Sequence, residues 1–145
     1  MKKRNLIVLS ILISLVFFKV GFAQGTKGDD AENEDGIISA QNWMALVDNK
    51  NYFESWETAA RIFKSSVSAH KWEKIVTKVR DPLGNLISRD LFHDQLTASL
   101  PGMPDGQYLI LRYVSKFANK AKSVESVTVM IDTDGKWRVA GYFIK

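Results

Sequence analysis

Residues 107–145, QYLILRYVSKFANKAKSVESVTVMIDTDGKWRVAGYFIK, decide the fold class of this chain. Within this stretch, residues 107–117, 124–131 and 137–144 show strand-type alternation of side chains. The last two segments are separated by residues 132–135, DTDG, which end in the Asp-Gly pair typical of a hairpin turn. We therefore expect three consecutive antiparallel strands at the carboxyl end.

A further strand is expected upstream, over residues 86–100. Fifteen residues exceed the usual strand length, so we expect this strand to contain a bulge. Residues 101–106, PGMPDG, hold two of the three prolines and form the following loop. Strands 107–117 and 137–144 carry bulky apolar residues on both faces, so either the sheet curls around other elements or a partner covers its outer face.

The periodicity before residue 84 is helical rather than strand-like. Apolar residues spaced i, i+3, i+4 and i+7 predict a first helix over residues 40–47, and a second stripe predicts a helix from about 53 to 63. Ser68 is a good N-cap for a third helix, which Pro82 ends. Helices followed by strands predict an α+β domain, with three helices packed on a curved four-stranded antiparallel sheet.

The amino-terminal residues have the features of a secretory signal peptide. A basic start, MKKR, precedes an apolar run over residues 6–18, and small residues stand at Gly21 and Ala23. A run of thirteen residues, all apolar except Ser10 and Ser14, is too short for a membrane span, so we expect cleavage after Ala23 and an exported product, periplasmic or secreted, with no integral membrane span. Residues 24–36 are acidic and lack large apolar side chains, which predicts a disordered leader before a single domain at 37–145.

Composition excludes several classes of function. The whole chain has 20 basic and 16 acidic residues, but four of the basic residues lie in the predicted signal peptide, which leaves 16 of each. A neutral mature protein gives no reason to expect nucleic acid as a partner. The absence of cysteine excludes disulfides, thiolate zinc sites, iron–sulfur clusters and cysteine nucleophiles.

Five separated segments together carry a resemblance to a known family. They are WMALVDNKNYFESWETAARIFKSSVS (43–68), VRDPLGNLISR (79–89), SLPGMPDGQYLILRY (99–113), FANKAKSVESVTVM (117–130) and GKWRVAGYFIK (135–145). In this order they resemble the bacterial family called domain of unknown function 4019, from about residue 39 to the end. That family has no established activity. A looser likeness to the cone-shaped nuclear-transport-factor-2-like and cystatin-like superfamily implies a shape, not a chemistry.

No motif for metal or cofactor binding is present. His70 and His93 are the only histidines, and neither has the spacing of a metal-binding pair. All four tryptophans stand at positions expected in the core. We assign no catalytic, cofactor-binding or metal-binding residue, and we expect no cofactor.

Two functions from different classes remain open. The first is a non-catalytic exported module of the cell envelope that binds a small apolar or amphipathic ligand, an envelope protein or a second copy of itself. The alternative is a small-molecule enzyme of isomerase or cyclase type, with a carboxylate as general base in the cone. Its candidate acids are Asp90, Asp94 and Glu125, with Tyr108, Tyr113 and Tyr142 as possible donors; the dyad considered is Asp90 or Asp94 with Tyr113. Ordinary cross-strand pairing with Arg89, Arg112 or Lys116 is the competing interpretation.

Overall fold

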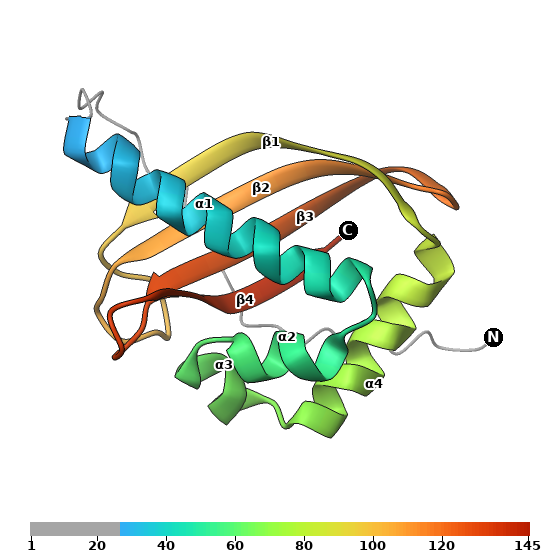
Figure 1. Cartoon of the computed structure of the whole chain (residues 1–145), viewed down its shortest axis with the longest axis horizontal. Helices are drawn as coiled ribbons and strands as arrows, with labels where there is room; N and C mark the ends of the chain where they lie inside the picture. Colours follow the sequence, from blue (N-terminus) through green and yellow to red (C-terminus); the bar gives the residue numbers. More distant parts are fainter. Residues whose placement is uncertain (1–26) are drawn as a thin grey trace.

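The computed structural model describes residues 27–145, so the predicted signal peptide and cleavage site lie outside the described residues. Helices precede strands, as expected, and the helices lie on one face of an antiparallel sheet (Figure 1). The α+β class is therefore confirmed. The elements are α1 (Lys27–Asp48), α2 (Tyr52–Thr58), α3 (Arg61–Ser66), α4 (Ala69–Arg80), a short 3₁₀ turn (Asp81–Leu83), β1 (Leu86–Thr97), β2 (Tyr108–Phe117), β3 (Lys120–Ile131) and β4 (Trp137–Ile144).

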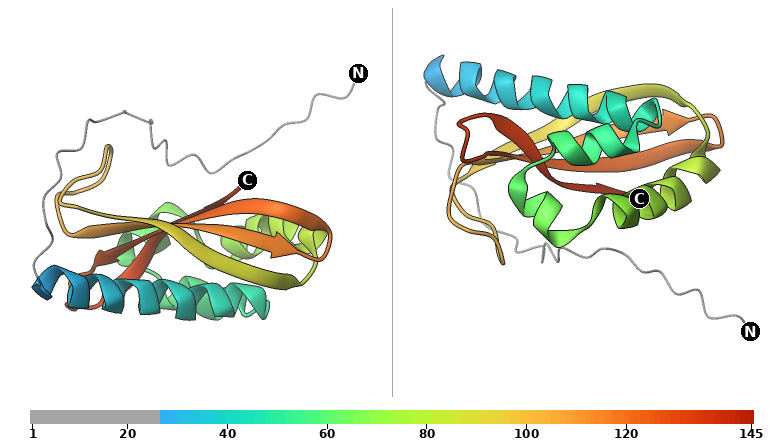
Figure 2. Two further views of the ribbon diagram at one scale, coloured as in Figure 1. Left: turned by 90° about the horizontal axis from the view of Figure 1, so that it is seen from above. Right: turned by 60° about the horizontal axis from the view of Figure 1, so that its bottom comes forward.

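The four strands form one open sheet in the order β1-β2-β3-β4, with every neighbouring pair antiparallel. The expected bulge is present in β1, where the pairing with β2 shifts between Leu91 and His93 and again between Leu86 and Ser88. Seen from above, the sheet is twisted and α1 runs along one side of it (Figure 2). The finer expectation of a cone closed around the helices stays a prediction.

The expected single helix over residues 53–63 was wrong, because two short helices occupy this region. α2 ends at Thr58, and Ala59 and Ala60 adopt extended backbone before α3 begins. The amide of Ala60 donates a hydrogen bond of 2.8 Å to the carbonyl of Val139 in β4. This contact with the sheet separates α2 from α3, although the apolar residues of this region keep helical spacing across the break.

Helix α1 begins at Lys27, inside the stretch 24–36 for which a disordered leader is the prediction. Residues 37–48 pack against the sheet, and once a helix is nucleated each added residue costs little. The close contact explains Gly36 in the middle of the helix. A Cβ atom there would lie 2.7 Å from Leu109 Cδ2 and 3.4 Å from the Trp137 ring.

Two buried indoles fill the space between helices and sheet. The Trp43 and Trp72 rings lie 5.7 Å apart, and Phe63 packs edge-on against both. Their ring N–H groups donate to Ser55, Trp43 to its carbonyl and Trp72 to its hydroxyl. Trp56 and Trp137 are partly buried against this cluster, so the tryptophans do occupy the core or its margin. Within residues 27–145, no helix combines the length and apolar character that crossing a membrane requires.

Candidate functional site

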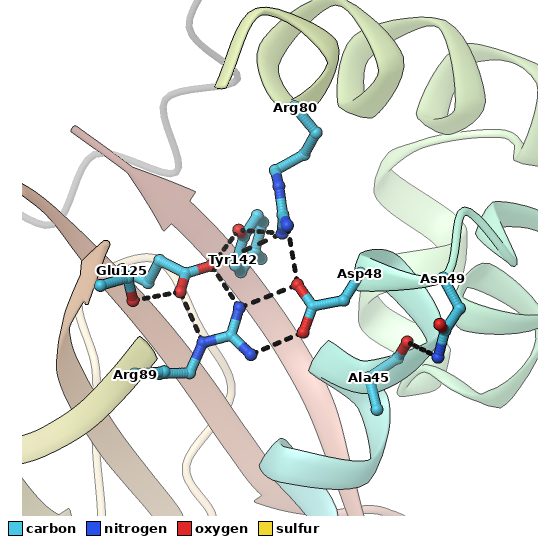
Figure 3. A network of polar contacts seen from close by, with 8 residues as sticks. Ala45, Asp48, Asn49, Arg80, Arg89, Glu125 and Tyr142 are labelled. Carbon is cyan, nitrogen blue, oxygen red and sulfur yellow. Dashed lines mark hydrogen bonds and ion pairs between the residues drawn. The ribbon is translucent and has the colours of Figure 1, made fainter. Parts of the chain in front are cut away.

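Four charged side chains and a tyrosine meet between the helices and the sheet. Asp48 and Arg80 are the last residues of α1 and α4, whereas Arg89, Glu125 and Tyr142 come from β1, β3 and β4 (Figure 3). Two acids and two guanidinium groups make this buried network neutral. We call these five residues the ionic network.

Glu125 is the most enclosed member of the ionic network, with none of its surface exposed. One carboxylate oxygen accepts hydrogen bonds from Arg89 Nε at 2.6 Å and from the Ser115 hydroxyl at 2.5 Å. The other accepts from Tyr142 Oη at 2.5 Å and from Arg89 Nη2 at 3.1 Å, and Arg80 Nη1 lies 3.6 Å away. Both oxygens are therefore fully engaged.

Asp48 joins the two arginines from the helix side. Its carboxylate accepts from Arg80 Nη2 at 2.7 Å and from Arg89 at 2.7 and 3.0 Å. Burial alone would raise the pKa of Asp48, but the hydrogen bonds from Arg89 and Arg80 outweigh it and hold the pKa below its usual value. A carboxylate at a helix C-terminus is unfavourable next to the helix dipole, and the two guanidinium groups offset this.

Arg80 and Tyr142 complete the ionic network on the side of α4. Arg80 donates to Tyr142 Oη at 3.2 Å and lies 4.7 Å over the ring centre of Phe117, a cation–π geometry. Burial, and then the neighbouring Glu125, raise the pKa of Tyr142 well above its usual value. The tyrosine hydroxyl is therefore a neutral donor to Glu125 at physiological pH.

Tyr113 lies beside this network without joining it. Its hydroxyl is buried and has no hydrogen-bond partner among the described residues. Burial raises the pKa of Tyr113 to about 12; the charge of Arg89 opposes this shift, and those of Glu125 and Asp94 add to it. A neutral, buried phenol of this kind does not serve as a proton acceptor near pH 7.

Neither Asp90 nor Asp94 forms a hydrogen bond with Tyr113. Asp90 pairs with Val114, on the face of β2 opposite to Tyr113, whereas Asp94 lies across from Leu111, on the same face as Tyr113. Both carboxylates are in exposed residues. Of the three acids considered from the sequence, Glu125 alone is buried.

Sequence reasoning missed Asp48 and Arg80, although one signal was present for Arg80, and it considered Tyr142 only as a possible donor to a substrate. Arg80 follows Trp72 and Val76 at a spacing of four, so it continues the buried stripe of α4. Glu125 similarly stands on the alternation that buries Val127 and Val129. A charge at a buried position indicates a partner, but not which one.

A second feature is an open groove of about 590 Å³ between α1 and the β3–β4 hairpin. Apolar walls come from Ile38 and Leu46 of α1 and from Trp137 of β4, with the basic side chains of Lys136 and Arg138 beside them. The ionic network does not line this groove. The structure thus separates its buried charges from its accessible apolar surface.

No metal site is found within the part of the chain that the structure describes. His70 and His93 are exposed and lie on different elements, α4 and β1. Among these residues, no group of three or more His, Asp or Glu side chains is placed to hold an ion.

Comparison with known proteins identifies the family. Searches of curated proteins and of solved structures found no match. Residues 39–142 match the family described as "Protein of unknown function (DUF4019)", which covers most of the chain and all four strands in whole or in part. The chain therefore belongs to the DUF4019 family.

Proposed function

We propose that this protein is a non-catalytic, exported binding module of the cell envelope, which holds a small apolar or amphipathic ligand. The observation that carries the proposal is the groove between α1 and the β3–β4 hairpin. Its volume of about 590 Å³ falls in the range of about 300–1,000 Å³ that is typical of small-ligand sites.

The residues around the groove suit an amphipathic molecule. Ile38 is 45% exposed there, and the partly buried ring of Trp137 supplies a flat apolar wall. Lys136 and Asn42 place polar groups at the same surface. A ligand with an apolar body and a polar head has a matching partner for each of its parts.

The distribution of charge favours binding over catalysis. The isomerase or cyclase alternative needs a carboxylate that reaches a substrate. Glu125, the one buried candidate, already accepts four hydrogen bonds and does not line the groove. The exposed Asp90 and Asp94 lack the burial that prepares a general base.

The binding proposal is tested with the amphipathic dye 8-anilinonaphthalene-1-sulfonate and two matched variants. Ile38→Ser removes an apolar group of the groove, and Phe53→Ser removes a similarly exposed apolar group on α2 outside it. We expect dye fluorescence to rise with the wild type and with Phe53→Ser, and Ile38→Ser to bind about tenfold more weakly, as loss of about 1.4 kcal/mol of apolar contact implies. No dye binding by the wild type, or equal losses in both variants, contradicts the proposal.

Export is tested separately, on the full-length chain expressed with its own amino terminus. The basic start and the apolar run of residues 6–18 support processing by a signal peptidase. We expect the protein in the periplasmic or extracellular fraction, with Gln24 as its first residue on amino-terminal sequencing. Intact protein beginning at Met1 in the cytoplasm contradicts export but leaves the binding proposal unaffected.

A further inference from the structure

The two edge strands of the sheet differ in whether their outward-facing backbone groups have hydrogen-bond partners. Along the β4 edge, the carbonyls of Trp137 and Val139 accept hydrogen bonds from Ser39 and Ala60 of the helical layer. β1 is the opposite edge, and no backbone hydrogen bond from another described element reaches its outer side. In Figure 1, β1 forms the upper rim of the sheet, and no other described element runs along it.

The free edge also carries exposed apolar side chains. Four of the eight exposed large apolar residues of the described chain stand on β1, among them Ile87 at 58% and Phe92 at 53% exposure. Lysine and proline, two residue types that protect edge strands from pairing, are absent from this strand, but it carries two register shifts and the charged residues Arg89, Asp90 and Asp94, which also limit pairing. The edge is therefore suited only to a partner strand that matches its bulge and its charges.

We propose that β1 pairs antiparallel with β1 of a second copy of this chain, about a two-fold axis that passes between Leu91 and Phe92. This register pairs residues 87–96 of the two strands. The facing pairs are Leu91 with Phe92, Asp90 with His93, Arg89 with Asp94, Ser88 with Gln95, and Ile87 with Leu96.

The strand is self-complementary in this register. Ile87 meets Leu96 in the other copy, and Ser88 meets Gln95, so apolar residues face apolar ones and polar residues face polar ones. Asp90 meets His93, an acid opposite a side chain that is neutral or positive. The two-fold axis doubles each of these contacts.

The bulge makes the same register consistent with the two faces of the sheet. In a continuous sheet, facing residues must lie on the same face, and a regular strand gives this only when their numbers have the same parity. In β1 the alternation reverses at the bulge: Asp90 and Ser88 lie on the outer face with Val114 and Lys116, whereas His93 and Gln95 lie on the outer face with Arg112 and Ile110. From residue 88 to residue 95, odd and even residues therefore face each other correctly across the axis. The second shift, between Leu86 and Ser88, ends this match, because Leu86 lies across from Phe117 on the helix face and Thr97 across from Tyr108 on the outer face.

The expected dimer is of modest strength. A single strand edge gives an interface near the small end of specific contacts, so its population depends on protein concentration. Arg89 is already held by Asp48 and Glu125, and its pairing with Asp94 of the other copy adds little. The apolar pairs and the backbone ladder carry the association.

Cross-linking tests the register directly, because the chain has no cysteine of its own. In a chain with Ser88→Cys and Gln95→Cys, each new thiol faces its counterpart in the other copy, at a Cα separation of about 4.5–5.5 Å that permits a disulfide. Within one chain these two positions lie about 23 Å apart along the strand, too far to join. We expect a covalent dimer on mild oxidation, seen on a non-reducing gel.

A register-shifted pair provides the control. Ser88→Cys with His93→Cys puts both thiols on the outer face but two residues out of alignment, so we expect little covalent dimer. Failure of the Ser88 and Gln95 pair to cross-link, or equal cross-linking of the shifted pair, overturns the proposed register.

Sedimentation equilibrium of the protein without new cysteines tests the association itself. We expect a monomer–dimer equilibrium for the wild type, a shift to monomer for Phe92→Lys, and no shift for Phe53→Lys, which makes the same change at 60% exposure on α2. A wild type that is monomeric at millimolar concentration, or that forms open-ended oligomers, overturns the proposal. Equal effects of the two lysine variants do so as well.

Discussion

Replacing Glu125 with glutamine tests the reasoning about the ionic network most sharply. The change keeps the shape of the side chain, so no cavity forms, but removes one of two negative charges that face two buried guanidinium groups. Arg89 and Arg80 then share Asp48 as their only acid within the ionic network. Loss of one partner from a buried ion pair costs about 3–5 kcal/mol, because the remaining charge stays desolvated.

The magnitude translates into a clear thermal effect. A domain of this size unfolds with an entropy that makes each kcal/mol worth about 4 °C, so Glu125→Gln is expected to lower the melting temperature by about 12–20 °C. Urea unfolding of the chain beginning at Gln24, followed by tryptophan fluorescence, measures the free energy. Trp43 and Trp72 are buried and report the transition.

Two further variants show whether charge is the cause. Glu73→Gln makes the same chemical change at an exposed position of α4 and is expected to leave stability almost unchanged. Glu125→Gln combined with Arg89→Gln restores the charge balance and is expected to lose about 1–3 kcal/mol less than the sum of the two single losses. A loss below about 1 kcal/mol for Glu125→Gln alone, or strict additivity in the pair, refutes the electrostatic account.

Two other predictions concern the same region. The pKa of Asp48 in the folded protein lies below its usual value near 3.9, so the ionised carboxylate stabilises the fold above about pH 4, and this contribution is lost as the pH falls through the lower folded pKa. Asp48→Asn should therefore be less stable than the wild type near pH 6. The urea midpoints of the two proteins should converge in acid. A gap that stays constant down to acid pH contradicts this. Tyr142→Phe loses bonds to Arg80 and Glu125 and should cost about 2 kcal/mol, whereas Tyr113→Phe removes an unpartnered hydroxyl and should be neutral or stabilising by about 1 kcal/mol. Equal urea midpoints for the two phenylalanine variants count against the difference in their hydrogen bonding.

Local patterns predicted the fold where local forces decide it. Alternation and turn residues identified all four strands, and the serine at position 68 caps α4 as expected, accepting a hydrogen bond from the amide of Lys71. The break between α2 and α3 was not predictable in this way, because it depends on the carbonyl of Val139, about eighty residues further along the chain. The part of α1 that packs on the sheet begins at Ile37, after the acidic stretch.

The candidate site was predictable only in fragments, for a similar reason. Periodicity places Arg80 and Glu125 on buried faces, yet their partners follow from where α1, α4 and the sheet meet. Asp48 and Arg89 are 41 residues apart and belong to different layers. A sequence indicates that a buried charge needs compensation, whereas the packing of elements decides which side chain supplies it.

The position of the ionic network explains how the edge strand β1 is ordered without being covered. Most residues of β1 are exposed, and its backbone pairs with β2 alone. Arg89 reaches inward from this strand to Asp48 of α1 and to Glu125 of β3, and so joins the edge to the helical layer by charge-assisted bonds. A strand secured through one inward side chain keeps its outer backbone available. The same arrangement that buries four charges thus holds β1 in place from the inside and leaves its outer edge unpaired, which favours pairing with a second copy.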